Sequence, residues 1–260
     1  MAVQEYIFDE QGVPYEQPVT GQYTAGARSG PYVTGERDNT GFFHKCLTDG
    51  TEGRPEVWFA IKPPGFENPA HFHNEVQFQV LLEGSISFPG HSVEAIGVHY
   101  TDINTPYGPS LTGPNLKEVS LRLRPPGEVR MSDPVGRKYR DPNGRELFGQ
   151  SKDVPWENLS GHLAGVKRKF LFGKPGEQGP KAQIWTCPPN SVTPLEAAPF
   201  GEYYILLEGS ASVGEDEMKP HSVRFVIGDD PPMPLTSGSN GSSWFIATLD
   251  QTSQQPGPLP

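Results

Sequence analysis

The feature that most limits what this chain can fold into is an internal repeat. The run Leu81-Leu82-Glu83-Gly84-Ser85 recurs, 125 residues later, as the run from Leu206 to Ser210. Proline and glycine mark turns, so their matched spacing implies matched strand lengths. The repeat therefore predicts two copies of one structural unit, over about residues 57–124 and 182–249. The same offset, without a gap, maps Pro63 onto Pro188, Pro64 onto Pro189, Pro69 onto Pro194, Pro106 onto Pro231, Pro109 onto Pro234 and Gly113 onto Gly238.

Each copy has the texture of short strands. Residues 57–61 and 182–186 are β-rich runs that end at a double proline, and residues 78–82 and 203–207 end at Glu-Gly. Residues 119–124 alternate between apolar and polar side chains, as a half-buried strand does. With 30 glycines and 29 prolines in 260 residues, long helices are disfavoured. The sequence predicts an all-β protein built from two tandem barrels.

Two histidines in the first copy form a candidate metal site. His71 and His73 stand two residues apart, so on a strand they share a face, and Gln77 could add an oxygen ligand. Such donors suit Fe(II), Mn, Ni, Cu or Zn, and a site left partly open is typical of catalysis. The alternatives are that both histidines lie on the surface, or that Glu75 replaces Gln77 after a shift in register.

The spacing around these histidines resembles a known signature. Gly65, five residues, His-Phe-His, three residues, Gln77, six residues and Gly84 resemble the first signature of the cupin superfamily, which has glutamate where this chain has Gln77. The resemblance implies a bicupin, with two tandem cupin (jelly-roll) β-barrels. The second signature supplies a further histidine after a Pro-Gly turn, and none follows Pro106. His99 is therefore a candidate fourth ligand, with an ordinary barrel or surface histidine as the alternative. Tyr107 is a candidate ligand or catalytic acid, with a turn aromatic as the alternative.

The second copy lacks these donors. The offset places Glu196 where the first copy has His71, Ala198 for His73, Glu202 for Gln77 and Arg224 for His99. We expect no transition-metal site there. The expected domains are an N-terminal arm (1–40), a metal-binding barrel (41–125), a linker (126–160), a degenerate barrel (161–250) and a disordered tail (251–260).

Charge and cysteine content limit the partners. A net charge of −10 and a pI near 5.2 disfavour nucleic acid and membrane surfaces. Cys46 and Cys187 are too few and too far apart for a disulfide framework, and residues 1–10 lack the apolar core of a signal peptide. We expect a soluble cytoplasmic protein that binds a small-molecule substrate. The expected oligomeric state is a monomer or a homodimer.

These observations lead to an expected activity. The first expectation is a metal-dependent bicupin enzyme, a dioxygenase-type oxidoreductase that uses a divalent transition metal, with Fe(II) preferred. Arg122 and Arg124, on one strand, could anchor a substrate carboxylate. The alternatives are a non-oxidative isomerase, lyase or decarboxylase, and a bicupin that binds a small molecule without turnover.

Overall fold

The computed structural model describes three N-terminal strands (3–4, 36–37 and 43–49) and residues 55–257, apart from gaps at 125, 135, 160–164, 196–198, 215, 227–232 and 255–256. The helices of this described part are three short 3-10 turns: η1 (Gly136–Lys138), η2 (Ser151–Asp153) and η3 (Gln251–Gln254). The rest is strands and turns, so the fold is all-β, as the sequence predicts. Among the described residues, no helix is long and apolar enough to cross a membrane.

The chain divides into two compact units. One contains residues 30–153 together with 251–260, and is called the first barrel below. The other contains residues 1–29 and 154–250, and is called the second barrel. The division differs from the expected one at both ends of the chain. Residues 1–29 are grouped with the second barrel, and residues 251–260 are grouped with the first barrel.

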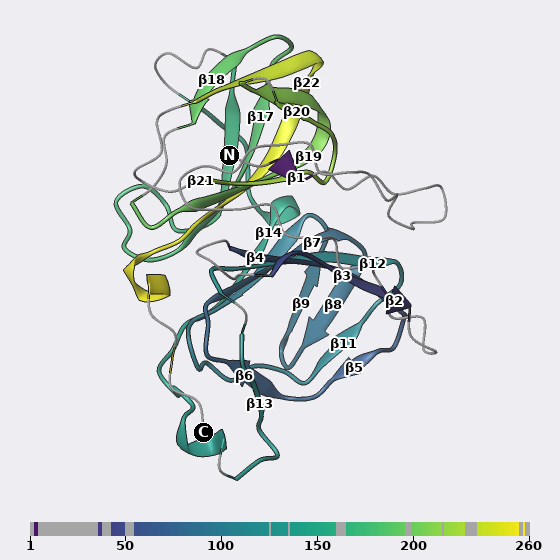
Figure 1. Cartoon of the computed structure of the whole chain (residues 1–260), viewed down its shortest axis with the longest axis vertical. Coiled ribbons are helices and arrows are strands. Elements are labelled where there is room, and N and C mark those ends of the chain that lie inside the picture. The colour runs from purple at the N-terminus through teal and green to yellow at the C-terminus, as the bar shows by residue number, and fades with distance from the viewer. Residues whose placement is uncertain are drawn as a thin grey trace. The chain divides into compact units, whose positions relative to one another are not determined.

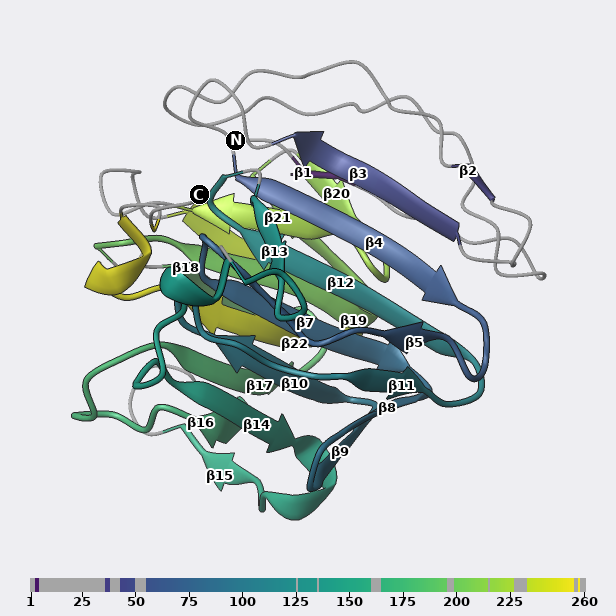
Figure 2. The same ribbon diagram turned by 90° about the horizontal axis from the view of Figure 1, so that it is seen from below.

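The first barrel has a large sheet and a smaller layer (Figures 1 and 2). The large sheet runs in the order β14 (Glu146–Gln150), β10 (Gly97–Thr101), β7 (Gln77–Glu83), β12 (Leu116–Arg122), β4 (Glu56–Lys62), β3 (Phe43–Asp49) and β2 (Glu36–Arg37). The smaller layer holds β5 (Glu67–Asn68), β11 (Ser110–Thr112), β8 (Ser85–Phe88) and β9 (His91–Glu94), and a separate pair, β13 (Glu128–Arg130) with β6 (His71–His73). Part of its apolar core is Leu81, Ile86, Phe88, Val93, Tyr107 and Leu116.

The second barrel is built on one continuous sheet. Its order is β1 (Val3–Gln4), β21 (Val223–Val226), β19 (Glu202–Val213), β22 (Met233–Thr248), β17 (Lys181–Cys187), β16 (Lys167–Phe172) and β15 (Glu157–Asn158). Two further strands pair onto the long ones: β18 (Val192–Leu195) onto β22, and β20 (Asp216–Met218) onto β19. Its core surrounds the fully buried Trp244.

The repeat is structural, as predicted. Phe78 of β7 pairs with Tyr100 of β10, and Tyr203 of β19 pairs with Phe225 of β21, with ring centroids 4.7 Å apart in both barrels. All four residues obey the 125-residue offset. The backbone conformation also matches at one equivalent pair, since Gly84 and Gly209 both have a positive φ (74° and 83°), Gly84 between β7 and β8 and Gly209 within β19. Pro231 lies outside the described residues, so its equivalence with Pro106 stays a prediction.

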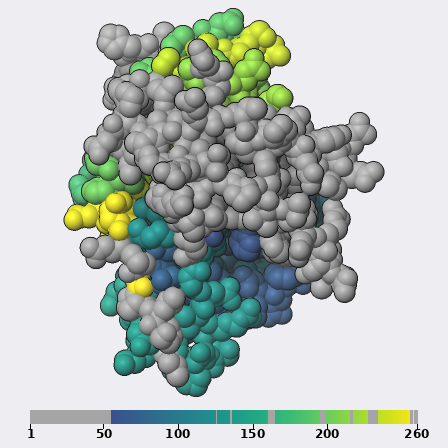
Figure 3. All heavy atoms as spheres, viewed as in Figure 1, coloured from purple at the N-terminus to yellow at the C-terminus, as the bar shows by residue number. Residues whose placement is uncertain are grey.

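Two segments differ from their expected roles. The expected linker contains β13 and β14, which pair with β6 and β10 of the first barrel. The expected disordered tail contains η3, and the Ser253 carbonyl accepts a hydrogen bond from Nη2 of Arg124 at 2.8 Å. Yellow atoms near the C-terminus lie against the first barrel (Figure 3). The composition of these two segments does not predict either feature. The segments are held by strand pairing and hydrogen bonds to distant residues rather than by a pattern of apolar side chains.

Candidate metal centre

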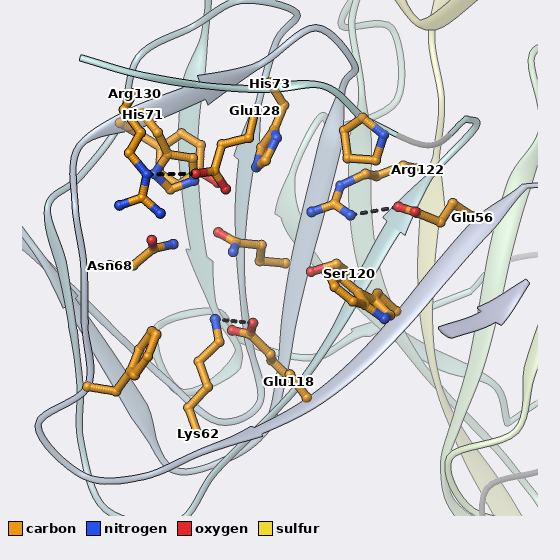
Figure 4. A pocket seen from close by; sticks show the side chains of 16 residues that line it. Glu56, Lys62, Asn68, His71, His73, Glu118, Ser120, Arg122, Glu128 and Arg130 are labelled. Atoms are coloured by element: carbon orange, nitrogen blue, oxygen red, sulfur yellow. Dashed lines mark hydrogen bonds and ion pairs between the residues drawn. The ribbon is translucent and has the colours of Figure 1, made fainter. Parts of the chain in front are cut away.

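The candidate centre is built by the pairing of β6 with β13. His71 and His73 lie on β6, and the antiparallel register sets Glu128 opposite His73 and Arg130 opposite His71. One donor atom each from His71, His73 and Glu128 lie within 4.8 Å of one another. Figure 4 shows the three side chains gathered at one end of a cavity.

His71 is held with one nitrogen left for an ion. Its Nδ1 hydrogen donates to the carbonyl of Pro69 at 2.6 Å, which leaves the Nε2 lone pair as the ligand. The backbone of His71 is fixed by two hydrogen bonds with Tyr107, of 3.1 and 2.9 Å. The ring is therefore oriented before any metal arrives.

His73 has a buried nitrogen that needs a partner. Its Nδ1 has no hydrogen-bond partner among the described residues, although the Gly127 backbone is near enough to raise the pKa of the ring. Burial has the larger effect and lowers the pKa of His73 well below its usual value, with Arg122 adding to the shift. Burial also lowers the pKa of His71. Both imidazoles are thus neutral near pH 7, which is the form that binds metal.

The donor set fits a divalent transition metal. Ligands about 2.1 Å from one ion lie within about 4.2 Å of each other, so a small side-chain shift would close the observed 4.8 Å. Glu128 and Arg130 pair at 3.3 Å and are 39% and 52% exposed, so both side chains have room for that shift. Two histidines with one carboxylate is the set that non-haem Fe(II) oxygenases use.

A cavity of about 460 Å³ opens beside these donors. Two buried ion pairs line it: Lys62 with Glu118 at 2.5 Å, and Arg122 with Glu56 at 2.6 Å. Figure 4 shows the Lys62 pair at the opposite end from the histidines and the Arg122 pair at the side. The volume is in the range of small-molecule sites, and the lining combines charged side chains with apolar ones such as Trp58 and Phe66.

Gln77 does not have the role that its place in the signature suggests. Its amide oxygen accepts a hydrogen bond from Nε of Arg122 at 2.7 Å, and its amide nitrogen donates to the Tyr107 hydroxyl at 3.1 Å. Gln77 is fully buried and is not part of the cavity lining. Because both ends of the amide are engaged, its oxygen is not offered to an ion, and Glu128 supplies the third donor.

Tyr107 does line the cavity, as a catalytic residue would. Burial raises the pKa of its phenol, so the hydroxyl keeps its hydrogen at any ordinary pH. Its ring lies 4.4 Å from the His71 ring and 6.2 Å from the His73 ring, between centroids. The position suits a hydrogen-bond donor to a bound molecule.

His99 is not placed as a fourth ligand. It is buried, its Nδ1 lies 2.6 Å from Oε1 of Gln79 and its Nε2 lies 3.0 Å from Oε1 of Glu146. Its ring packs against the Phe88 and Phe148 rings. Both ring nitrogens have protein partners, so His99 is a structural residue of the large sheet.

The two arginines that were predicted to bind substrate, Arg122 and Arg124, lie in different surroundings. Arg122 lines the cavity. Arg124 is outside the lining, because its Nε donates to Glu75 at 2.6 Å and its Nη2 donates to the Ser253 carbonyl. Glu75, the alternative ligand, is engaged in this ion pair with Arg124. Its pKa is raised, mainly by burial.

The roles of Glu128 and of the Lys62–Glu118 pair in the site were not predicted from the sequence. Glu128 lies 55 residues after His73 and joins it only through strand pairing. One local signal exists, since Glu128 directly follows Pro126-Gly127, the kind of turn after which a late ligand was sought. Lys62 and Glu118 carry no local signal.

The equivalent positions in the second barrel are only partly described. Glu196 and Ala198 lie outside the described residues. Glu202 is hydrogen-bonded by the Tyr204 hydroxyl at 2.5 Å and the Thr248 hydroxyl at 2.6 Å, and burial raises its pKa. Arg224 is fully buried. The expectation of a metal-free second barrel stays a prediction.

Comparison with known proteins identifies the fold. No protein-family model and no curated protein matches the sequence. A Nostoc punctiforme structure with a provisional dioxygenase assignment has a TM-score of 0.61 at 14% identity, over 84% of this chain and 78% of its own. The other proteins compared also have cupin folds. The chain has a cupin fold.

Two other structures extend this likeness. Lactobacillus farciminis oxalate decarboxylase, solved as a formate complex, has a TM-score of 0.60 at 11% identity, over 87% of this chain and 88% of its own. The Escherichia coli pirin YhhW, solved with nickel(II), has a TM-score of 0.55 at 9% identity, over 84% and 95%. Both cover most of this chain, so the likeness extends over both barrels of the cupin fold.

Proposed function

We propose that this protein is a metal-dependent enzyme that oxidises a small organic anion in the cavity of the first barrel, with dioxygen as the oxidant. The observation that carries the proposal is the convergence of His71, His73 and Glu128 at the end of a polar cavity. A metal bound by two histidines and one carboxylate keeps open positions for substrate and dioxygen. The structure with a provisional dioxygenase assignment and the nickel(II)-bound pirin, both described above, support a metal-dependent enzyme of this class.

The cavity charges favour an anionic substrate. Lys62, Arg122 and Arg130 balance Glu56, Glu118 and Glu128 in the lining. A divalent ion would therefore leave an excess of positive charge, which an organic anion neutralises. Arg122, held by Glu56 and Gln77, is a rigid anchor for a carboxylate.

Two further side chains would act on the polar atoms of the substrate. Tyr107 keeps its hydrogen and can donate a hydrogen bond to an oxygen atom of the substrate, while Gln77 orients the hydroxyl. Glu118 has one buried oxygen without a hydrogen-bond partner among the described residues. That oxygen can accept a proton from the substrate, with Lys62 stabilising the carboxylate beforehand.

A decarboxylase is the second candidate, because a buried carboxylate beside a cationic anchor also suits loss of CO₂ and because oxalate decarboxylase shares the fold. The two reactions differ in their balance. A dioxygenase transfers both atoms of O₂ to the substrate, which supplies all the electrons. A decarboxylase releases CO₂ without consuming O₂.

The test is an assay of the Fe(II)-loaded protein with a panel of small carboxylic acids and enols. We expect O₂ uptake that matches substrate loss, and two ¹⁸O atoms in the product from ¹⁸O₂. CO₂ release without O₂ uptake would assign the decarboxylase instead. Tight binding of an acid with neither product would leave a binding protein, and no metal binding at all would refute the metal centre.

A further inference from the structure

The described residues of the C-terminal segment, Gln251–Gln254 and Gly257, touch the part of the chain that carries the candidate ligands. The Gly257 amide donates to the Asn74 carbonyl at 2.7 Å, and Nδ2 of Asn74 donates to the Gly257 carbonyl at 3.3 Å. Asn74 directly follows His73. The chain thus returns, after the whole second barrel, to the residue next to a candidate ligand.

Asn74 also joins the two ligand strands to each other. Its amide donates to the Gly127 carbonyl at 3.2 Å, and its Oδ1 accepts from the Gly127 amide at 2.6 Å. Gly127 directly precedes Glu128. One asparagine therefore links the C-terminal segment, the His73 strand and the Glu128 strand.

The C-terminal segment is itself held in place, so it can restrain the paired strands β6 and β13. Ser253 is fully buried, and the carbonyls of Ser253 and Gln254 accept hydrogen bonds from the Arg124 guanidinium at 2.8 and 3.2 Å. The same guanidinium is fixed by Glu75 at 2.6 Å. Donors from a fixed planar group hold backbone carbonyls in a defined place.

Gly257 packs too closely for any larger residue. An added Cβ would lie 2.3 Å from Cγ2 of Ile103 and 2.7 Å from Oδ1 of Asn104. Asn104 is buried, and its amide donates to the His73 carbonyl at 2.7 Å. The segment thus adjoins two neighbours of His73: Asn74, which follows it in the chain, and Asn104, whose backbone amide donates to its carbonyl.

We propose that the described part of the C-terminal segment, Gln251–Gln254 and Gly257, acts as a strap that positions His73 and Glu128 for metal binding. This inference rests on the proposed metal centre for its function. The physical reason is that ligands must be held within about 0.5 Å of their bound geometry, and outer partners that hold them are worth about 10–100-fold in metal affinity. Asn74 and the strap are positioning groups, since neither touches the metal.

Two variants test the strap: a chain ending at Asp250, and Gly257→Val in the full chain. The matched control is a chain ending at Gly257, which keeps the strap contacts. Metal affinity is measured by calorimetric titration with Ni(II). We expect both variants to bind at least about 10-fold more weakly than wild type, and the control to bind as wild type does.

Amide hydrogen exchange of the metal-free protein supplies a readout that needs no ion. We expect faster exchange at Asn74, Gly127 and the β6–β13 amides in both variants, with unchanged exchange between β17 and β22 of the second barrel. If the shortened chain does not fold, Gly257→Val decides alone.

The outcomes separate the two proposals. Wild-type affinity with wild-type exchange in Gly257→Val would overturn the strap. A wild type that binds no metal would refute the proposed function, while faster exchange at β6 and β13 would still support the strap as the segment that holds this pair of strands. Exchange that rises equally in every strand would mean that the segment stabilises the whole chain rather than the β6–β13 pair.

Discussion

At the scale of single residues, the third donor decides how the centre is understood. Gln77 occupies the sequence position at which a ligand was expected, yet its amide is shared between Arg122 and Tyr107. Glu128 reaches the histidines from a neighbouring strand. The carboxylate thus comes from a different place in the chain, and Gln77 instead holds the cavity's arginine and phenol.

This assignment predicts opposite outcomes at the two positions. Glu128→Gln should weaken divalent-metal binding by about 10-fold or more, because an amide oxygen is a poorer donor than a carboxylate. Gln77→Glu should leave the affinity near that of wild type, because the new carboxylate meets Arg122. Calorimetric titration measures both. Tighter binding in Gln77→Glu together with no change in Glu128→Gln would return the ligand role to residue 77.

His99 gives a prediction about pH. Burial lowers its pKa below 6.5, so below that pH the unfolded chain binds a proton that the folded chain refuses. Stability is therefore full above pH 6.5 and falls as the pH drops toward the lowered folded value, by at most about 1.4 kcal/mol per pH unit for one group. In urea unfolding of the metal-free protein at pH 7.0 and 5.5, His99→Gln should show a smaller loss than wild type. An equal loss in both proteins would mean that His99 does not contribute.

At the scale of elements, β4 and β12 carry a charge pair into the barrel. Lys62 and Glu118 lie on these adjacent strands and are 8% and 3% exposed. Taking two charges out of water is costly, so such a pair stabilises little in itself, but the loss of one partner leaves a buried uncompensated charge. The pair is better explained by the cavity's chemistry than by stability.

A double-mutant cycle tests this view. Lys62→Met should destabilise the barrel by roughly 3–5 kcal/mol, and Lys62→Met with Glu118→Leu should recover most of that loss. The double variant should fold and bind metal but have no turnover. Chemical unfolding and the oxygen-uptake assay measure the two effects, and full activity in the double variant would remove the pair from the mechanism.

At the scale of the whole molecule, the two barrels share a fold and differ in their donors. We predict one tightly bound divalent ion per chain. His71→Ala with His73→Ala should abolish binding while the protein stays folded, because these residues lie at a cavity wall rather than in the apolar core. Glu202→Gln, at the position equivalent to Gln77, is the matched control and should still bind one ion. Elemental analysis after gel filtration gives the count, and two ions per wild-type chain would contradict the division between barrels.

Much of the fold could be predicted because short local patterns of strand and turn residues specify it, and these patterns occur in both copies of the repeat. The β-rich runs at 57–61 and 78–82 became β4 and β7 with one added residue at each end. Gly84 marks the place where β7 ends, since its positive φ suits glycine, whereas the equivalent Gly209 lies at an irregularity inside the longer β19.

The site could be predicted only in part. Alternation on a short strand placed His71 and His73 together. The pairing of β13 with β6 joins residues far apart in the chain through backbone groups that every sequence has, and the Arg124 side chain bonds to a backbone carbonyl, that of Ser253. No local pattern encodes them, so Glu128 and the docked C-terminal segment came only from the structure.

The return of residues 251–257 to the first barrel has a consequence for biosynthesis. A ribosome makes the first barrel's strands early, then spends roughly 5–20 seconds on the hundred or so residues that precede the strap. Until this segment leaves the exit tunnel, β6 and β13 are already made but lack the hydrogen bonds that the segment supplies. Acquisition of the ion would then have to wait until the segment has docked on the first barrel.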